Sequence, residues 1–181
     1  MFNFKNGSLG FTLFELMISM AVISIVSSVV FAGKNQEEKK LFLKTTAFSL
    51  SQNLREYQEK ALSAQNIACP SPSHNLCGFG FNFVEGNDFY TPFADCSLNC
   101  LSSGHFLDEN DVIFSAVSLG KTKICSLAGG NLNIVFSPPD PTVYLNNVKW
   151  GSEVGIALCL KSDTAIQKNV KVNNAGKIEI Q

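Results

Sequence analysis

Glu15 is the one charged residue in a long apolar stretch near the start of the chain. The run Phe11–Phe31 contains 21 residues, and the others in it are apolar or small hydroxyl residues. A helix of this length spans roughly 30 Å, which matches the apolar thickness of a bilayer. Because a carboxylate is costly in that environment, Glu15 is a candidate functional group that needs a cationic partner.

The residues around Glu15 follow a recognisable order, which is Gly10, Phe11, Thr12-Leu13, Phe14 and Glu15. This order, after a short polar leader and before the apolar run, resembles the N-terminus of type IV prepilins and type II secretion pseudopilins. The resemblance implies that prepilin peptidase, a membrane aspartic peptidase, cuts between Gly10 and Phe11 and methylates the new amine of Phe11. It also implies that Glu15 faces the terminal amine of a neighbouring subunit in a filament.

Two other interpretations of the apolar run stay open. It could be an ordinary signal anchor, or a cleaved secretory signal with Val30-Phe31-Ala32 as its small-residue cleavage site. The run is long for the apolar part of a secretory signal. The lysines after the run outnumber Lys5 in the leader, which taken alone favours a cytoplasmic C-terminal part. The cysteines favour an exported C-terminal part instead.

The cysteines all lie beyond residue 64, at Cys69, Cys77, Cys96, Cys100, Cys125 and Cys159. An even number confined to one region indicates disulfides formed in an oxidising compartment. The sequence allows many pairings, and we expect Cys69–Cys77, Cys96–Cys100 and Cys125–Cys159. The longest of these loops would stabilise most in the chain-entropy model, by about 3–4 kcal/mol.

Two clusters could bind metal ions. A zinc site could be built from Cys69, His74 and Cys77 and from Cys96 and Cys100 with His105, but neither spacing is a recognised zinc pair and disulfides are favoured. The run Asp108–Asp111 gathers oxygen ligands without the spacing of a calcium loop, so we interpret it as a solvated turn before a strand. We therefore expect no metal and no cofactor.

Enzymatic and nucleic-acid functions find little support. The only histidines are His74 and His105, and the chain has no nucleophile elbow, phosphate loop or zinc-protease motif. Lysines make residues 161–181 basic, but residues 65–181 carry seven lysines against ten acidic residues. Arg55 is the only arginine. We therefore expect neither catalysis nor a nucleic-acid partner.

The segment after the apolar run is expected to continue as an amphipathic helix. One apolar stripe has helical spacing and consists of Leu43, Ala47, Leu50, Leu54, Tyr57, Ala61 and Ala64. The chain has no proline before Pro70, so a single long helix is predicted, loosened at Gly33. The pair Pro70 and Pro72 then ends the helical signal.

The rest of the chain reads as short strands. Phe79, Phe81 and Phe83 alternate with small or polar residues, and a turn at residues 85–88 predicts a hairpin with Phe89-Tyr90-Thr91. Further strands are predicted at Val112–Val117, Leu132–Phe136, Gly155–Leu160, Ile166–Val172 and Lys177–Ile180, with a turn at residues 173–176 joining the last two. The expected fold class is α+β, with the long helix packed against a small antiparallel sheet.

Four segments follow from these patterns: a leader (1–10), a membrane-spanning helix (11–33), its amphipathic continuation (34–64) and a disulfide-stapled β-rich domain (65–181). The order of elements resembles minor pilins and minor pseudopilins, which end in a similar strand after a glycine. This implies a non-enzymatic filament subunit, with major and minor pilin or pseudopilin subunits as partners. It would span the bacterial inner membrane once, with its C-terminal domain in the periplasm or at the cell surface. The alternative is a filament-tip binding module, either an adhesin or a DNA-uptake receptor.

Overall fold

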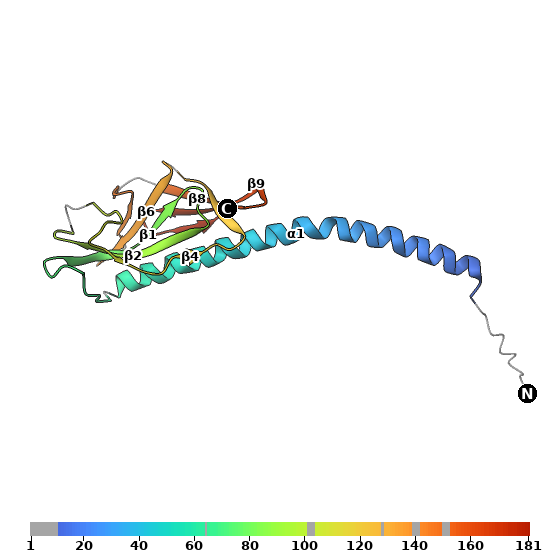
Figure 1. Ribbon diagram of the computed structural model, residues 1–181, viewed down its shortest axis with the longest axis horizontal. Coiled ribbons are helices and arrows are strands. Elements are labelled where there is room, and N and C mark those ends of the chain that lie inside the picture. The colour runs from blue at the N-terminus through green and yellow to red at the C-terminus, as the bar shows by residue number, and fades with distance from the viewer. Residues whose placement is uncertain (1–10, 64, 101–103, 128, 139–141, 150–152) are drawn as a thin grey trace, which may run out of the picture. The chain divides into compact units, whose positions relative to one another are not determined.

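The computed structural model describes residues 11–181, apart from residues 64, 101–103, 128, 139–141 and 150–152, and apart from the side chains of residues 30–35. The predicted leader, residues 1–10, lies outside this description. By the spatial clustering of its Cα atoms, the chain divides into two compact units, Met1–Lys39 and Lys40–Gln181. Figure 1 labels the main elements along the chain.

A single helix, α1 (Leu13–Leu62), passes through both units. The two helical segments predicted from the sequence are therefore continuous, and the helix runs through Gly33 without a break. No proline lies within it. At its C-terminal end the amide of Ser63 still donates to the carbonyl of Glu59 at 2.8 Å, and the prolines that follow cannot continue the helix.

The first antiparallel sheet has the strand order β3-β2-β1-β6-β7, and β4 also pairs with β2. Its strands are β1 (Asn75–Val84), β2 (Phe89–Ser97), β3 (Val112–Ile113), β4 (Val117–Ser118), β6 (Asn131–Ser137) and β7 (Thr142–Leu145). The predicted hairpin is confirmed as β1 and β2, whose turn contains Gly86 at a φ of 88°. Such a positive φ favours glycine because an L side chain would be strained there.

The second antiparallel sheet has the order β10-β9-β8-β5. Its strands are β5 (Thr122–Ser126), β8 (Glu153–Leu160), β9 (Asp163–Asn173) and β10 (Ile178–Ile180). The predicted turn between the last two strands is confirmed, with Val172 opposite Ile178 and Gly176 at a φ of 77°. The α+β class is thus confirmed, although the strands form two sheets where one was expected.

Three other details of the strand prediction were wrong. The strand expected over residues 112–117 is two short pieces, β3 and β4, which pair with different residues of the same strand β2. Strands β5 and β7 were not predicted. Strand β5 is interrupted by a bulge between Ile124 and Ser126, and β7 has only four residues, so each gives only a weak period-two signal.

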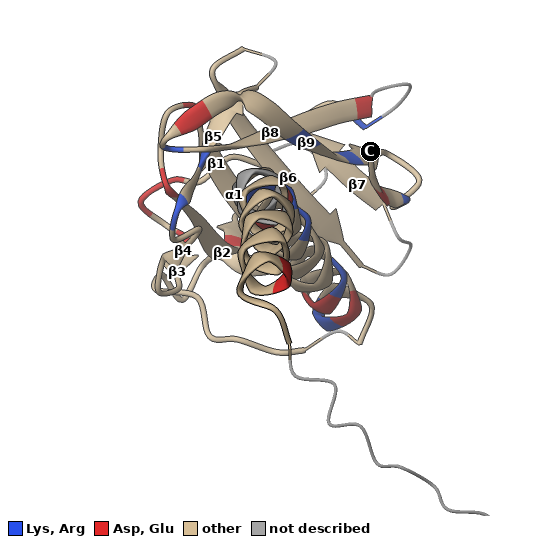
Figure 2. Ribbon diagram, turned by 90° about the vertical axis from the view of Figure 1, so that its right-hand side faces the viewer, with Lys and Arg blue, Asp and Glu red and all other residues tan. Residues whose placement is uncertain are grey.

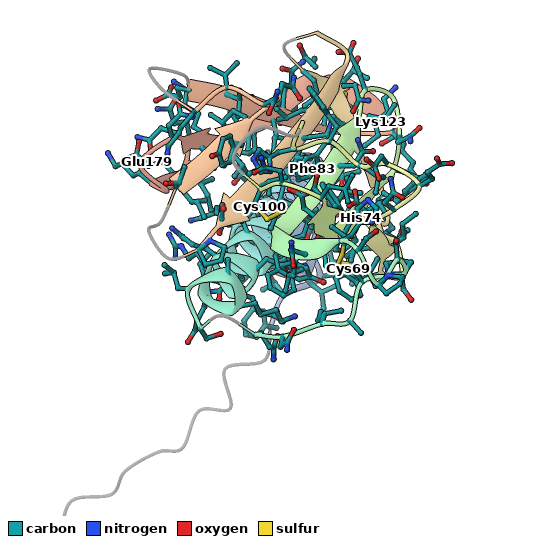
Figure 3. All side chains as sticks on the ribbon, turned by 90° about the vertical axis from the view of Figure 1, so that its left-hand side faces the viewer. Cys69, His74, Phe83, Cys100, Lys123 and Glu179 are labelled. Carbon is teal, nitrogen blue, oxygen red and sulfur yellow. A yellow bond between two sulfur atoms is a disulfide. The ribbon has the colours of Figure 1, made fainter. Side chains whose placement is uncertain are left out.

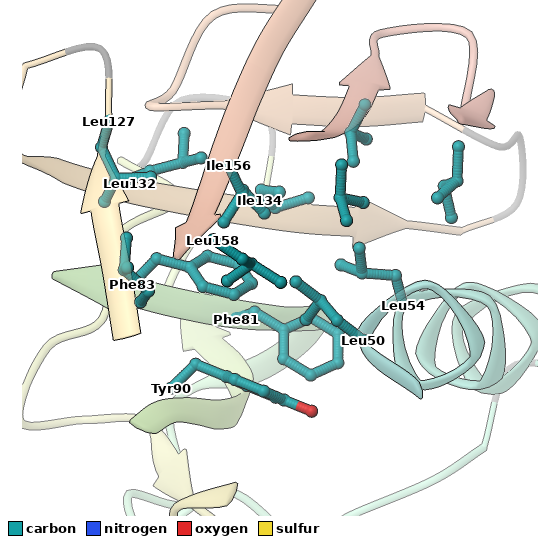
Figure 4. Packing of buried hydrophobic residues seen from close by; sticks show 14 of the residues in the cluster. Leu50, Leu54, Phe81, Phe83, Tyr90, Leu127, Leu132, Ile134, Ile156 and Leu158 are labelled. Carbon is teal, nitrogen blue, oxygen red and sulfur yellow. The ribbon is translucent and has the colours of Figure 1, made fainter. Parts of the chain in front are cut away.

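The core of the globular unit lies between the second half of α1 and the sheets. The predicted apolar stripe is confirmed, since Leu43, Ala47, Leu50, Leu54 and Ala61 are at most 2% exposed, while Ala64 lies outside the described residues. The alternating phenylalanines of β1 are buried as well. Figure 4 shows Leu50 and Leu54 pointing from the helix toward Phe81 and the residues of β6 and β8 behind it.

Polar and aromatic contacts fix the helix against the strands. Tyr57 is the central contact, with its ring centroid 4.5 Å from that of Phe81 and 6.0 Å from that of Phe114. On the same turn of the helix, Arg55 and Gln58 donate hydrogen bonds to the carbonyls of Ile178 and Gly176. These bonds attach the β9–β10 hairpin to the helix, so the end of the chain closes the core.

Candidate assembly site

The N-terminal unit begins with a helix cap at Thr12. The Thr12 hydroxyl accepts a hydrogen bond from the backbone amide of Glu15 at 3.2 Å, and the Thr12 carbonyl accepts one from Leu16. Threonine is a favoured N-cap residue, and a glutamate three residues later is the usual companion in a capping box. The Thr-Leu-Phe-Glu part of the motif therefore starts the helix and sets Glu15 in its first turn, where the helix dipole favours negative charge.

Apolar side chains project from all sides of α1 in this unit. Each of the large apolar residues described here is at least half exposed, and Phe11 and Phe14 are more than 70% exposed. The set consists of Phe11, Leu13, Phe14, Leu16, Met17, Ile18, Met20, Val22, Ile23, Ile25, Val26 and Val29. A helix that is apolar all round requires burial in lipid or among other helices.

Three serines of the run donate hydrogen bonds to backbone carbonyls within the helix. Ser19 donates to the carbonyl of Glu15, Ser24 to that of Met20 and Ser28 to that of Ile25, at 2.7–2.8 Å. These serines can therefore enter an apolar environment with their hydroxyls already bonded. The Glu15 carboxylate differs, because it forms no ion pair with any described residue.

Along the described part of the chain, no helix combines the length and mean hydropathy expected of a membrane span.

The disulfide pairing differs from the prediction for four of the six cysteines. The bonds are Cys69–Cys96 and Cys77–Cys100, with Cα–Cα distances of 5.9 and 5.0 Å, and the expected pairs Cys69–Cys77 and Cys96–Cys100 were wrong. Figure 3 labels one cysteine of each bond. The prediction favoured the shortest loops. In the structure, the β1–β2 hairpin places Cys96 opposite Leu76, and Cys96 is bonded to Cys69 in the segment that precedes β1.

The third disulfide was predicted correctly. Cys125 and Cys159 are bonded, with their Cα atoms 5.8 Å apart, and they join the neighbouring strands β5 and β8. Cys125 occupies the bulge of β5, while Cys159 is fully buried.

Near the Cys69–Cys96 bond, sequence reasoning missed a cluster of buried polar residues. His105 and Asp95 are each 2% exposed, and the His105 Nδ1 and an Asp95 carboxylate oxygen share a hydrogen bond of 2.5 Å. The His105 ring also stacks on that of Tyr144, with centroids 3.8 Å apart. No spacing rule connects these residues, because the sheet brings them together from β2, β7 and the loop between β2 and β3.

Asp111 belongs to the same region, and the expectation of a fully solvated turn was wrong for this residue. It is 6% exposed, and its carboxylate accepts hydrogen bonds from the amides of Cys96 and Asp108 at 2.8 and 2.9 Å. Burial raises the pKa of Asp111 to about 6, although these two hydrogen bonds act in the opposite direction. The Asp108 carboxylate in turn accepts a hydrogen bond from the backbone amide of Asn110. The carboxylates of Asp108 and Asp111 therefore both bind backbone amides nearby.

The cysteines considered as zinc ligands are all consumed in disulfides, and among the described residues no three metal-ligating side chains converge.

The C-terminal lysines mostly lie beside acidic residues. Ion pairs join Lys161 to Asp88, Lys171 to Glu153 and Lys177 to Glu179, and the hydrogen bond from Lys161 lowers the pKa of Asp88. Figure 2 shows basic and acidic segments interspersed around the globular unit. Three of the basic side chains described at this end of the chain are therefore neutralised locally. The fourth lysine, Lys168, lies in a groove described below.

Comparison with known families matches residues 5–31 to a family described as the prokaryotic N-terminal methylation motif. No curated protein and no solved structure matches the chain. The matched region contains the capped helix start, the exposed apolar surface and Glu15 described above. The chain therefore carries, at its N-terminus, the prepilin-type methylation motif typical of type IV pilin-like proteins.

Proposed function

We propose that this protein is a non-enzymatic structural subunit, a minor pilin or pseudopilin, of a type IV pilus or type II secretion filament. Prepilin peptidase would remove residues 1–10 and methylate the amine of Phe11. The apolar helix would anchor the protein in the inner membrane, with the globular unit exported, and would then enter the filament core beside the helices of other subunits.

The observation that carries the proposal is the contrast between Glu15 and its surroundings. Ser19, Ser24 and Ser28 of the apolar run are hydrogen-bonded within the helix, whereas the Glu15 carboxylate has no ion-pair partner among the described residues. Burial of this carboxylate in an apolar environment is costly unless a cation compensates it. The terminal amine of Phe11 on an adjacent subunit would supply that cation.

The two units differ in what they can offer a filament. In the globular unit, the apolar stripe of α1 is already covered by the sheets. In the N-terminal unit, the apolar side chains remain exposed and available for lipid or for other helices. Three disulfides also suit a domain that folds outside the cytosol. The exposed apolar surface of the N-terminal unit therefore supports assembly through the first half of the helix.

The test is the incorporation of a Glu15→Gln variant into filaments, with Glu59→Gln as a matched control on the same helix. The glutamine side chain keeps the shape of Glu15 and removes its charge, so the partner amine would be left uncompensated at a cost of about 3–5 kcal/mol. We expect the Glu15→Gln variant to be inserted and cleaved, yet to be absent from sheared filaments and from crosslinks to the major subunit. Incorporation equal to that of the control would refute the charge-pairing role.

A further inference from the structure

A groove of about 410 Å³ lies in the globular unit, between the first turns of α1 after Lys40 and the β9–β10 hairpin. Its lining consists of Leu41, Lys44, Thr45, Phe48, Lys168 and Ile180. It therefore combines apolar side chains from the helix and the last strand with one lysine from each side.

The apolar side chains of this groove face solvent. Leu41 is 64% exposed, Phe48 is 53% exposed and Ile180 is 37% exposed. The opposite face of the same helical turns carries Leu43 and Ala47, which are fully buried in the core. The groove is thus a second apolar surface of the helix, and clustered exposed apolar side chains can serve as an interaction site.

The two lysines of the groove differ from three other lysines in the C-terminal part of the chain. Lys161, Lys171 and Lys177 are ion-paired, whereas neither Lys44 nor Lys168 forms an ion pair with a described residue. Two ammonium groups beside a solvent-facing apolar surface are complementary to a molecule with an anionic head and an apolar body. An anionic phospholipid has this chemistry.

The groove follows the apolar run closely along the chain, which indicates that such a ligand would come from the membrane. Leu41 follows Phe31, the last residue of the apolar run, by ten residues in the same helix. If the run lies in the membrane, the residues that follow it are those closest to the lipid headgroups. Aromatic side chains and lysines are typical of that interface, and each lysine near an anionic surface contributes about 1 kcal/mol of attraction.

We propose that this groove holds an anionic phospholipid of the membrane surface, with the lipid phosphate between Lys44 and Lys168 and apolar lipid atoms against Leu41, Phe48 and Ile180. The proposal rests on the membrane anchoring in the proposed function. Occupation of the groove would hold the globular unit on the membrane before assembly, and release of the lipid would accompany entry into a filament.

The test is lysine acetylation of the full chain, reconstituted in vesicles of phosphatidylcholine alone or mixed with phosphatidylglycerol and read out by peptide mass spectrometry. Lys60, on the same helix, and Lys123, on the same sheet, serve as controls within each sample because neither lines the groove. We expect phosphatidylglycerol to slow acetylation of Lys44 and Lys168 about fivefold each. Acetylation of the two control lysines should remain unchanged.

Two further arms identify the ligand. Inorganic phosphate added to phosphatidylcholine vesicles should not protect the groove lysines, because it lacks the apolar part. Phe48→Ser should reduce the protection by phosphatidylglycerol, while Phe106→Ser, at a similarly exposed site outside the groove, should leave it intact.

Several results would overturn the proposal. Equal protection of all four lysines would indicate general attraction to the charged surface, and equal protection by inorganic phosphate would indicate an anion site. Alkaline extraction of the same vesicles distinguishes a failure of membrane anchoring from a failure of lipid binding in the groove. Loss of the chain on extraction would refute the anchoring and the groove proposal with it, whereas a retained chain with unprotected groove lysines would refute the groove proposal alone.

Discussion

The carboxylate of Asp111 accepts a hydrogen bond of 2.8 Å from the backbone amide of Cys96, which fastens the turn before β3 to the strand that carries the Cys69–Cys96 disulfide. Burial raises the pKa of Asp111 to about 6 in the folded protein, whereas an unfolded aspartate titrates near 3.9. The folded state therefore binds the proton more tightly. The contribution of Asp111 to the free energy of unfolding should rise as the pH falls from 7 through 6, and should level off near pH 4.

Denaturant unfolding at pH 7 and pH 5 measures this effect. The wild-type protein should gain about 1 kcal/mol from Asp111 between these two pH values. Asp111→Asn cannot titrate, so it should lose this part of the pH dependence. Identical pH dependence in the two proteins would contradict the raised pKa of Asp111.

Disulfide mapping under non-reducing conditions should find the peptide of Cys96 joined to that of Cys69, and the peptide of Cys100 joined to that of Cys77. The three bonded pairs are separated by 27, 23 and 34 residues, so the chain-entropy model assigns each about 3–4 kcal/mol. Removal of either of the first two pairs by double substitution with Ala should therefore cost about as much as removal of Cys125–Cys159. A Cys96–Cys100 peptide in native protein would contradict the pairing.

Gly80 and Gly155 provide a matched pair of strand glycines. A Cβ atom at Gly80 would lie 2.7 Å from the carbonyl oxygen of Ile134 and 2.9 Å from the ring of Phe93, whereas one at Gly155 meets nothing within 4 Å. Gly80→Ala should therefore destabilise the protein by about 1–3 kcal/mol through overpacking. Gly155→Ala should change the free energy of unfolding by less than about 1 kcal/mol. Urea titration followed by near-ultraviolet circular dichroism separates the two, and equal effects would contradict the close approach of β1 and β6.

Processing at Gly10 has a direct mass signature. The mature chain, extracted from membranes, should begin at Phe11 and carry one additional methyl group. Gly10→Val should leave the leader in place, because a side chain there would obstruct the peptidase. Gly7→Val, in the same leader, should be processed normally. A mature chain that begins at Gly33 would instead establish cleavage of a secretory signal.

The sequence determined those features that depend on neighbours along the chain. Thr12 caps the helix three residues before Glu15, and the apolar stripe from Leu43 to Ala61 has the period of a helix, so both follow from local spacing. The β1–β2 hairpin and the β9–β10 hairpin also follow, because each combines period-two alternation with a glycine turn. The methylation motif is likewise a contiguous string of residues.

Only the tertiary structure decided which distant residues meet. The hairpin carries Cys96 to Cys69 and leaves Cys77 for Cys100, an outcome that loop length alone does not favour. The burial of Asp111 and the pairing of His105 with Asp95 join residues that no spacing rule connects. The groove between Phe48 and Ile180 likewise requires the last strand to pack beside the helix. In each case the partner is set by strand order and register, because the backbone bonds that fix them join residues far apart along the chain.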